Sequence, residues 1–268
     1  MANVGDTAVS TLLNPEATQT IDWQAEQLRC TGFLVPLYDV SAQDIFRLVT
    51  QTDPVQLVEN RQQALQTASG PFGPGKLDVV KLPGRVDILF LGREDNATDP
   101  GINILGLWAE MSDLFDNGVR AWLRLRPQLQ RIALGAVCVA GVSDRVSGYK
   151  MLYRLLPRVD IDVEHSSDLF YQINRPRLAT FGDSFPCKIN RVSKWSTAAL
   201  VLHTFTVSAK ELPPGAMNIP AAIRHYSRVE LDLSTDAELV ALPAEHLESI
   251  WMKLLNFATE MLSKGDVP

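Results

Sequence analysis

The part of the sequence that decides the fold reads KLDVVKLPGRVDILFL, from Lys76 to Leu91. It holds two short runs of apolar and β-branched residues, which are typical of strands, separated by Pro83-Gly84, which favours a turn. Two strands joined by so short a connection must run antiparallel. The sequence therefore predicts a β-hairpin here and an antiparallel sheet around it.

Helical patterns lie on both sides of this hairpin. Ser41, with Asp44 three residues later, resembles a capping box and predicts a helix to Val49. Asp53-Pro54 resembles a second cap and predicts a further helix to about Thr67. Apolar residues at three- and four-residue spacing predict three more helices: Ile104–Trp122, Val146–Leu156 capped by Ser143, and Ala244–Leu262.

Strand-like runs fill most of the remaining chain: Trp23–Tyr38, Gln130–Val142, Leu169–Leu178, Cys187–Arg191, Ala198–Val207 and His225–Leu233. Strict strand–helix alternation, which would indicate a parallel sheet, is absent. We therefore expect an α+β fold, with a largely antiparallel sheet and packed helices that include a C-terminal helix. We expect residues 1–20 to form a flexible arm and residues 21–268 a single α+β domain; the alternative division has two sub-lobes, 21–142 and 143–268.

The composition indicates a cytoplasmic protein. The chain has 268 residues and a formal net charge of −6. No stretch approaches the roughly 20 apolar residues of a membrane-spanning helix, and residues 1–20 lack the pattern of a signal peptide. Cys30, Cys138 and Cys187 are too widely spaced for a zinc site and odd in number. We therefore expect reduced thiols, no membrane contact, no metal and no cofactor.

Two glycine-containing strings resemble functional motifs, but both are better explained as turns. Gly70–Lys76 lacks the spacing of a phosphate-binding loop and precedes a predicted strand rather than a helix. Gly182-Asp183-Ser184 resembles the nucleophile block of certain esterases, but it lies between two predicted strands and lacks a strand–elbow–helix context. Neither string predicts an active site.

The isolated histidines and one run of acidic residues do not predict a catalytic or metal site either. None of the four histidines has a second histidine or a cysteine at metal-chelating spacing. Asp160, Asp162 and Glu164 alternate, which on a strand would place three carboxylates on one face. A solvated strand edge is favoured there over a divalent-cation site.

Charge is distributed unevenly along the chain. The segment from Arg120 to Trp195 contains 13 basic and 6 acidic residues, a net charge of +7, and the rest of the chain carries −13. Within this segment Lys150, Arg154 and Arg158 form one stripe of a predicted helix, a pattern that attracts phosphate. The alternatives are a surface neutralised by the acidic remainder of the chain, and a docking surface for an acidic protein partner.

Two segments inside the basic region echo each other, QINRPR from Gln172 and KINRVSKW from Lys188. On neighbouring strands the isoleucines would share one face and the asparagines the other. Arginines beside asparagines can hold a carboxylate or a phosphate in bidentate geometry, or they can equally satisfy buried backbone groups at a sheet edge. Trp195 can stack on either guanidinium. We therefore predict an anion- or partner-binding site that comprises Asn174, Arg175, Arg177, Asn190, Arg191, Lys194, Trp195, Lys150 and Arg154.

Four short strings carry a family resemblance: Gly84–Asp87, Tyr171–Arg177, Ile189–Trp195 and Glu230–Asp232. With these strings the chain resembles a sporadically distributed, uncharacterised bacterial protein family, over much of Arg85 to Asp232. No activity, cofactor or fold is established for that family. The resemblance implies a bacterial origin, with a setting in mobile-element or defence-related gene clusters as a further expectation.

Three functional hypotheses follow from the sequence. The first is a non-enzymatic binding or assembly protein that acts through a protein partner or by self-association. It follows from the lack of catalytic clusters in the sequence and from the Trp and Arg residues in the middle of the chain, since both types are enriched in interfaces. The second is a nucleic-acid accessory subunit that uses the basic segment, with Arg124, Lys150, Arg154, Arg175 and Arg191. The third is a hydrolase built from Asp183, Ser184 and either His203 or His225.

Overall fold

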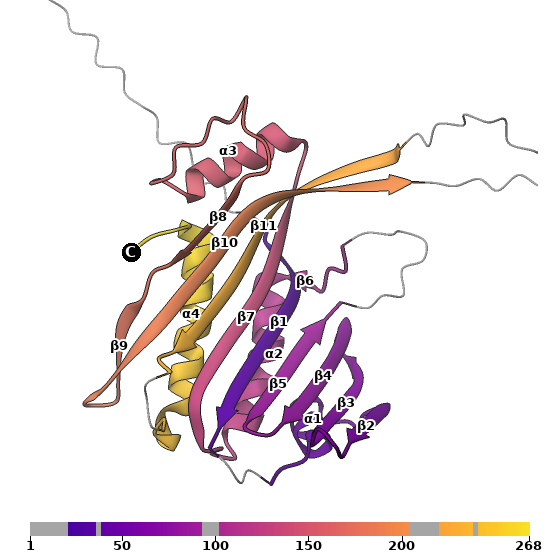
Figure 1. The fold of residues 1–268 in the computed structure, drawn as a ribbon, viewed down its shortest axis with the longest axis vertical. Helices are drawn as coiled ribbons and strands as arrows, with labels where there is room; N and C mark the ends of the chain where they lie inside the picture. Colours follow the sequence, from indigo (N-terminus) through magenta and orange to yellow (C-terminus); the bar gives the residue numbers. More distant parts are fainter. Residues whose placement is uncertain (1–20, 36–38, 93–101, 204–219, 238–240) are drawn as a thin grey trace, which may run out of the picture.

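The computed structural model describes residues 21–35, 39–92, 102–203, 220–237 and 241–268 (Figure 1). The predicted arm, residues 1–20, lies outside the described residues. The elements in chain order are β1 (Gln24–Leu34), α1 (Ala42–Thr50), β2 (Gln56–Asn60), β3 (Leu65–Phe72), β4 (Gly75–Leu82), β5 (Arg85–Leu91), β6 (Gly106–Leu107), α2 (Trp108–Leu123), β7 (Leu129–Val142), α3 (Arg145–Leu155), β8 (Phe170–Asn174), β9 (Arg177–Phe181), β10 (Phe185–His203), β11 (Pro220–Thr235), a 3-10 turn (Ala244–His246) and α4 (Leu247–Lys264).

The described strands form one 11-stranded sheet with the order β2-β3-β4-β5-β1-β7-β11-β10-β8. In addition, β6 pairs with β1 and β9 pairs with β10. All of these pairs are antiparallel, so the predicted α+β fold with an antiparallel sheet is confirmed. The predicted hairpin is β4–β5, with Lys76 opposite Leu91. The β7–β11 pair joins residues 21–142 and 143–268 within this single sheet.

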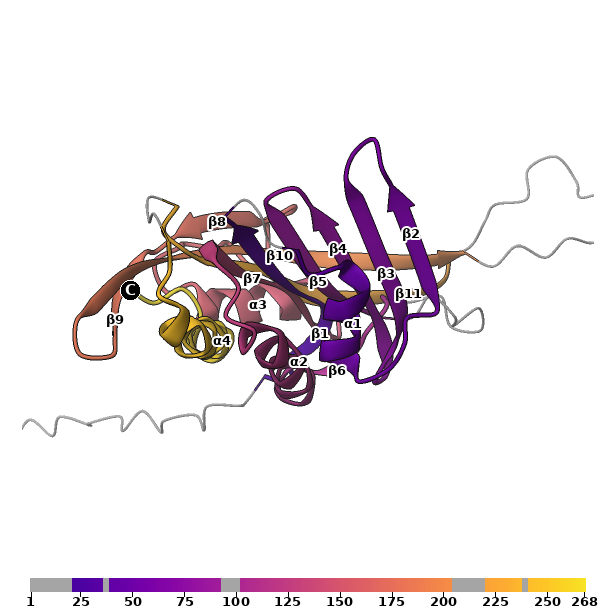
Figure 2. The same cartoon turned by 90° about the horizontal axis from the view of Figure 1, so that it is seen from below.

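The four helices pack against the same face of the sheet. Figure 2 shows α1, α2 and α4 along one side of the strands. On this face the ring of Trp122, from α2, lies directly over Gly32 of β1, where a Cβ atom would come within 2.5 Å of the ring. Further along the sheet, Gly148 of α3 contacts Thr197 of β10 and accepts a hydrogen bond from Ser227 of β11. The main hydrophobic core therefore lies between this face and the helices.

β10 and β11 are the longest of the described strands, and β10 joins two strands that the sequence predicts separately. The sequence predicts separate strands at Cys187–Arg191 and Ala198–Val207, whereas β10 runs without a break from Phe185 to His203. β9 pairs with β10 up to Ile189, and β8 pairs with it up to Ser196. Beyond that point β10 pairs only with β11, among the described residues. The two strands leave the body of the sheet as a two-stranded ribbon (Figures 1 and 2).

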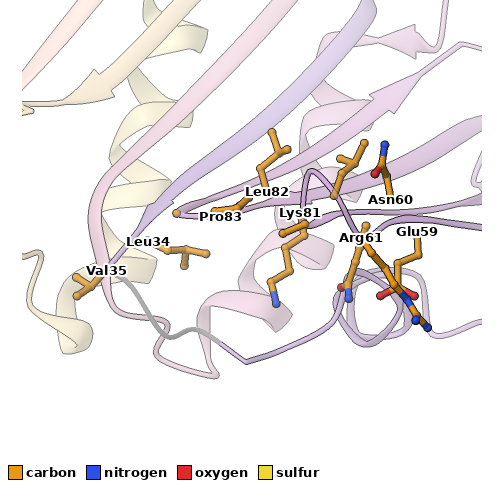
Figure 3. A pocket seen from close by; sticks show the side chains of 12 residues that line it. Leu34, Val35, Glu59, Asn60, Arg61, Lys81, Leu82 and Pro83 are labelled. Atoms are coloured by element: carbon orange, nitrogen blue, oxygen red, sulfur yellow. The ribbon is translucent and has the colours of Figure 1, made fainter.

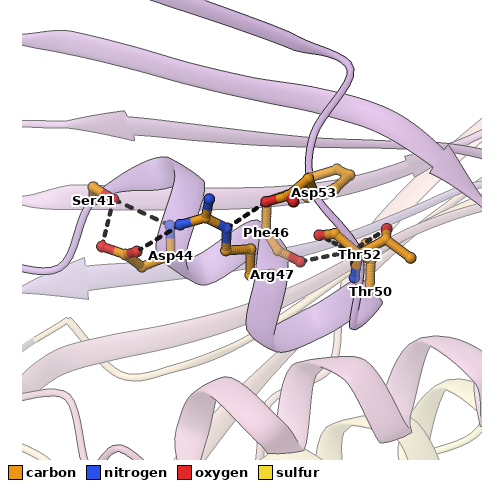
Figure 4. A network of polar contacts seen from close by, with 7 residues as sticks. All are labelled: Ser41, Asp44, Phe46, Arg47, Thr50, Thr52 and Asp53. Carbon is orange, nitrogen blue, oxygen red and sulfur yellow. Dashed lines mark hydrogen bonds and ion pairs between the residues drawn. The ribbon is translucent and has the colours of Figure 1, made fainter.

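The predicted helix from Asp53 to Thr67 is wrong, because this segment forms β2 and the start of β3. The preceding helix α1 has the predicted cap, since the amide of Asp44 donates to Ser41 Oγ at 3.1 Å. It ends at Gln51, which adopts a left-handed conformation with φ of 60°. Asp53 then accepts a hydrogen bond from Arg47 Nε at 2.6 Å instead of capping a second helix (Figure 4).

Three smaller expectations also change. Gly70 to Phe72 belong to β3, so the predicted turn is confined to residues 73–74. Asp144 rather than Ser143 caps α3, because its carboxylate accepts from the amide of Ser147 at 2.7 Å. The acidic run around Asp162 is a turn and not a strand edge, since the Asp162 carboxylate accepts from the amides of Glu164 and His165.

The cysteines lie in the interior of the protein. All three cysteines are free and buried. Burial raises the pKa of Cys30, Cys138 and Cys187, which disfavours their reactive thiolate form. No helix of the described residues has both the length and the apolar character needed to cross a membrane.

Candidate functional site

The paired Asn-Arg segments lie side by side, as the sequence predicts. Asn174 ends β8, and the side-chain amide of Asn174 donates to Asn190 Oδ1 on β10 at 3.1 Å. Asn174 Oδ1 also accepts a hydrogen bond from the backbone amide of Arg191 at 3.0 Å. The two asparagines lie on the face away from the helices, whereas Ile189 is buried on the helix side. The asparagines therefore fix the place where the chain bends from β8 into β9.

Arg175, in that bend, binds the chain's own C-terminal segment. Its Nε and Nη2 donate to the two carboxylate oxygens of Asp266, at 2.5 and 2.7 Å. Tyr171 Oη donates to the same carboxylate at 3.1 Å, and the backbone amide of Asp266 donates to Leu155 O at 2.8 Å. Asp266 is only 3% exposed. The bidentate geometry predicted for an external anion is thus occupied by an internal carboxylate.

Arg177 and Arg191 complete the cluster from the helix-side face of the sheet. Arg191 is 1% exposed and donates to Arg175 O at 2.8 Å and to Val267 O at 3.0 Å. Arg177 Nη1 donates to Glu260 Oε2 on α4 at 2.7 Å. We call the set Arg175, Arg177, Arg191, Glu260 and Asp266 the arginine cluster. It ties the end of α4 and residues 265–268 to β9 and β10.

The aromatic partner of these guanidinium groups is Phe257, and the predicted stacking on Trp195 is wrong. The Phe257 ring centroid lies 5.0 Å from Arg177 Cζ and 5.3 Å from Arg191 Cζ. Trp195 is fully buried, and its Nε1 donates to Ser193 Oγ at 2.9 Å. Its ring instead meets Trp23 edge-on, with centroids 6.3 Å apart. Trp195 is therefore a core residue that no external partner reaches in this conformation.

The remaining predicted site residues lie apart from the cluster. Lys194 is on the helix-free face, where its Nζ is 3.4 Å from Glu230 Oε2. Lys150 and Arg154 are exposed on α3, and no carboxylate of the described residues pairs with either. The structure therefore brings together the Asn174–Arg177 and Asn190–Arg191 segments but does not add Lys150, Arg154 or Lys194 to them.

The basic segment is partly neutralised by the C-terminal part of the chain. Six of its basic side chains pair with carboxylates between Glu230 and Asp266: Arg120 and Arg124 with Glu248, Arg175 with Asp266, Arg177 with Glu260, Lys188 with Asp236, and Lys194 with Glu230. Of the three alternatives for the charge pattern, these contacts favour the internally compensated surface.

The electrostatics of the cluster agree with its structural role. Burial raises the pKa of Asp266, but hydrogen bonds from Arg175 and Tyr171 outweigh burial and hold the pKa below its ordinary value. Burial also raises the pKa of Glu260, but the hydrogen bond and the charge of Arg177 outweigh burial and hold this pKa below its ordinary value. Burial and the neighbouring charge of Arg177 lower the pKa of Arg191. Both carboxylates are thus stabilised in the ionised form at neutral pH.

The predicted hydrolase residues do not meet. Ser184 lies in the turn between β9 and β10, whereas His225 pairs with Ala199, fifteen residues further along β10. An extended strand of that length spans about 50 Å, far beyond hydrogen-bond reach. His203 lies further still along the same strand. In the part of the chain that the structure describes, no group of three His, Cys, Asp or Glu side chains is placed to hold a metal ion.

One pocket of the described residues is not built from the predicted site residues. It measures about 910 Å³ and lies at one end of β3 and β4, where Lys81, Arg61 and Glu59 are among its lining residues (Figure 3). A smaller pocket of about 530 Å³ lies between β9 and α4 and includes Arg177, Lys253 and Phe257. Neither pocket contains a set of groups arranged for acid–base or nucleophilic chemistry, among the described residues.

Asp266, Glu260 and Phe257 are the members of the site that sequence reasoning missed. Asp266 and Glu260 lie 91 and 83 positions after the arginines that they contact, and Phe257 lies 80 and 66 positions after Arg177 and Arg191. No local spacing therefore reveals them. The only signal in the sequence is the contrast between the basic central segment and the acidic remainder. Such a contrast indicates compensation but not which residues pair.

No protein-family model matches the chain, and no curated protein matches it. The site and the fold must therefore carry the functional argument.

Proposed function

We propose that the chain is a non-enzymatic assembly protein that binds another protein molecule, either a second copy of itself or a different protein partner. The ribbon formed by the ends of β10 and β11 supports this proposal. Its outer part is paired within itself and projects from the sheet (Figure 1). Two-stranded ribbons are marginally stable in water unless another element covers them.

Apolar side chains are exposed on this ribbon. Val201 of β10 and Ile223 of β11 are cross-strand partners, and they are 42% and 53% exposed. Leu200 and Ala199 lie beside them on β10. Burying apolar surface stabilises an interface by about 25 cal/mol for each Å². A ribbon with this composition is therefore better suited to contact with protein than to free solvent.

The nucleic-acid alternative has weaker support. Of the five basic residues that it requires, Arg124, Arg175 and Arg191 bind carboxylate or carbonyl groups of the chain itself. Only Lys150 and Arg154 stay exposed on α3. The expected bacterial origin, cytoplasmic location, and defence or mobile-element setting stay predictions.

Sedimentation velocity of the purified chain tests the proposal. A double variant, Val201→Glu with Ile223→Glu, removes the apolar pair, and Leu178→Glu is the matched control because Leu178 is an exposed strand residue outside the ribbon. We expect the wild type and the control to form a complex, by self-association or with a partner added back in purified form, and the double variant to lose it. A wild type that stays monomeric and binds the same proteins as the double variant would overturn the proposal.

A further inference from the structure

Beyond β8, the outer edge of β10 lacks the features that usually protect a strand edge. Proteins usually protect edges with short strands, prolines or charged side chains. β2, at one end of the sheet, is only five residues long and contains Glu59. The free edge of β11 begins at Pro220, which has no amide hydrogen, and ends at Arg224. These two edges have protection that β10 lacks.

The free edge of β10 begins where β8 ends. Ser196 pairs with Phe170 of β8, and no other described strand covers that side of β10 from Thr197 to His203. Residues 197–202 read TAALVL, without charge, proline or glycine. Such a sequence combines high β-propensity with unpaired backbone amides and carbonyls, which is the usual signature of strand addition. This edge can therefore accept a further strand.

We propose that this strand is β10 of a second copy, so that two chains join their β10 edges antiparallel about a two-fold axis at Leu200. This inference rests on the proposed assembly function and names the partner and the surface. A two-fold interface uses the same patch on both chains, so the patch must be self-complementary. The β10 edge meets this condition because self-pairing brings no like charges together.

The side-chain pattern favours this axis. Pairing about Leu200 places Ala199 opposite Val201 of the partner copy, and Ala198 opposite Leu202. Since Val201 also pairs with Ile223 within its own chain, one face of the joined ribbons carries a continuous row of Ile223, Val201 and Ala199 side chains from both copies. The exposed apolar side chains of the ribbon thereby gain neighbours across the interface.

β8 limits the length of the joined segment. Because β8 occupies the same edge of β10 up to Ser196, the pairing extends over residues 197–203 and stops at the partner's β8. Phe170, the first residue of β8, lies at this limit and is 64% exposed. A different protein that supplied a strand would use the same edge but would not need an axis at Leu200.

Cysteine cross-linking of the full chain tests the axis. Residues opposite each other in an antiparallel pair have Cα atoms about 4.5–5.5 Å apart, which suits a disulfide. The native cysteines are buried, so Leu200→Cys introduces an accessible thiol at the proposed axis. We expect mild oxidation to give a covalent dimer. Leu178→Cys on β9 and Leu57→Cys on β2, two exposed strand positions, are controls that should stay monomeric.

Opposite charges at the interface provide a second test that needs no oxidation. One double variant carries Ala199→Lys and Val201→Lys, and a second carries Ala199→Glu and Val201→Glu. We expect each double variant to be monomeric by itself, because like charges then face each other across the interface. Mixed, the two should form a heterodimer, because each lysine then faces a glutamate.

The results separate this inference from the proposed function. A wild type that self-associates through the ribbon, without cross-linking at Leu200 or charge rescue, would overturn the two-fold pairing and leave the assembly function standing. A monomeric wild type that binds a different protein through the ribbon would also overturn the two-fold pairing and leave the assembly function standing. A monomer without any ribbon-dependent partner would contradict both.

Discussion

Arg175 and Asp266 lie 91 residues apart in the sequence and form a two-point ion pair, with N···O distances of 2.5 and 2.7 Å. The pair anchors the segment after α4 to the bend between β8 and β9. It also means that two donors of Arg175, which the sequence predicts to hold an anion, already bind a carboxylate of the chain itself. The arginine cluster is consequently expected to contribute to stability rather than to recognition.

Replacement of Asp266 should destabilise the fold. Asp266→Asn removes the charge from a buried carboxylate that accepts from Arg175 and Tyr171, and breaking such a pair costs about 3 kcal/mol. Asp232→Asn is the control: its exposed carboxylate lies 3.9 Å from Arg29, so a change within about 0.5 kcal/mol is expected. Urea unfolding measures both, and equal effects would contradict the structural role of the cluster.

Acid should weaken the fold through the same carboxylates. The pKa values of Asp266 and Glu260 are lowered in the folded state. Their contribution is therefore complete above the ordinary carboxyl pKa of about 4 and is lost as the pH falls through the folded-state values. The stability contribution of Asp116 depends on pH in the opposite direction. Burial raises the pKa of Asp116, so its contribution to stability is lost as the pH rises.

Unfolding free energy measured against pH checks this expectation. The wild type should lose stability below about pH 4 more steeply than Asp266→Asn, because the variant lacks one of the titrating groups. Parallel curves for the two proteins would show that Asp266 is not stabilised by its arginine.

Gly265 should tolerate no side chain. It has φ of 76°, and a Cβ atom there would lie 1.8 Å from Leu155 O. Gly265→Ala should therefore lower the free energy of unfolding by about 3 kcal/mol or more. Gly141→Ala is the matched control, because nothing lies within 4 Å of its added Cβ, and it should change stability by less than about 1 kcal/mol. Thermal unfolding of both variants gives the comparison.

Arg191 should not be replaceable by lysine. Its guanidinium donates to the carbonyl oxygens of Arg175 and Val267, and a single ammonium group does not reproduce that fork. Leaving one buried carbonyl without a donor costs about 1–3 kcal/mol. Arg154→Lys, at an exposed position of α3, should have no measurable effect. Similar denaturation midpoints for the two variants would contradict this assignment.

Much of the fold can be predicted from the sequence because its signals are local. The β4–β5 hairpin, the Ser41 cap of α1 and the apolar stripe of α4 each depend on residues a few positions apart. The helix predicted after Asp53 is wrong because Val55, Leu57 and Val58 fit a helical spacing. In the structure these residues are exposed, in and beside a short edge strand. Its strand structure is decided by pairing with β3, which a local pattern does not reveal.

The site could be predicted only in part. The contact between Asn174 and Asn190 follows from strand alternation. Which groups the arginines bind depends on how α4 crosses the sheet and where residues 265–268 end, and that is a long-range property. The continuous β10 was likewise hidden, because the polar residues on either side of Trp195 separate its two apolar pieces in the sequence.

Hydrogen–deuterium exchange at the backbone amides of β10 tests the pairing of two copies most directly. If β10 edges pair, outward-facing amides in residues 197–203 should exchange slowly at high protein concentration and faster on dilution, while amides of β2, at Gln56–Asn60, exchange at the same rate throughout. Exchange of residues 197–203 that is fast and independent of concentration would contradict the joined sheet.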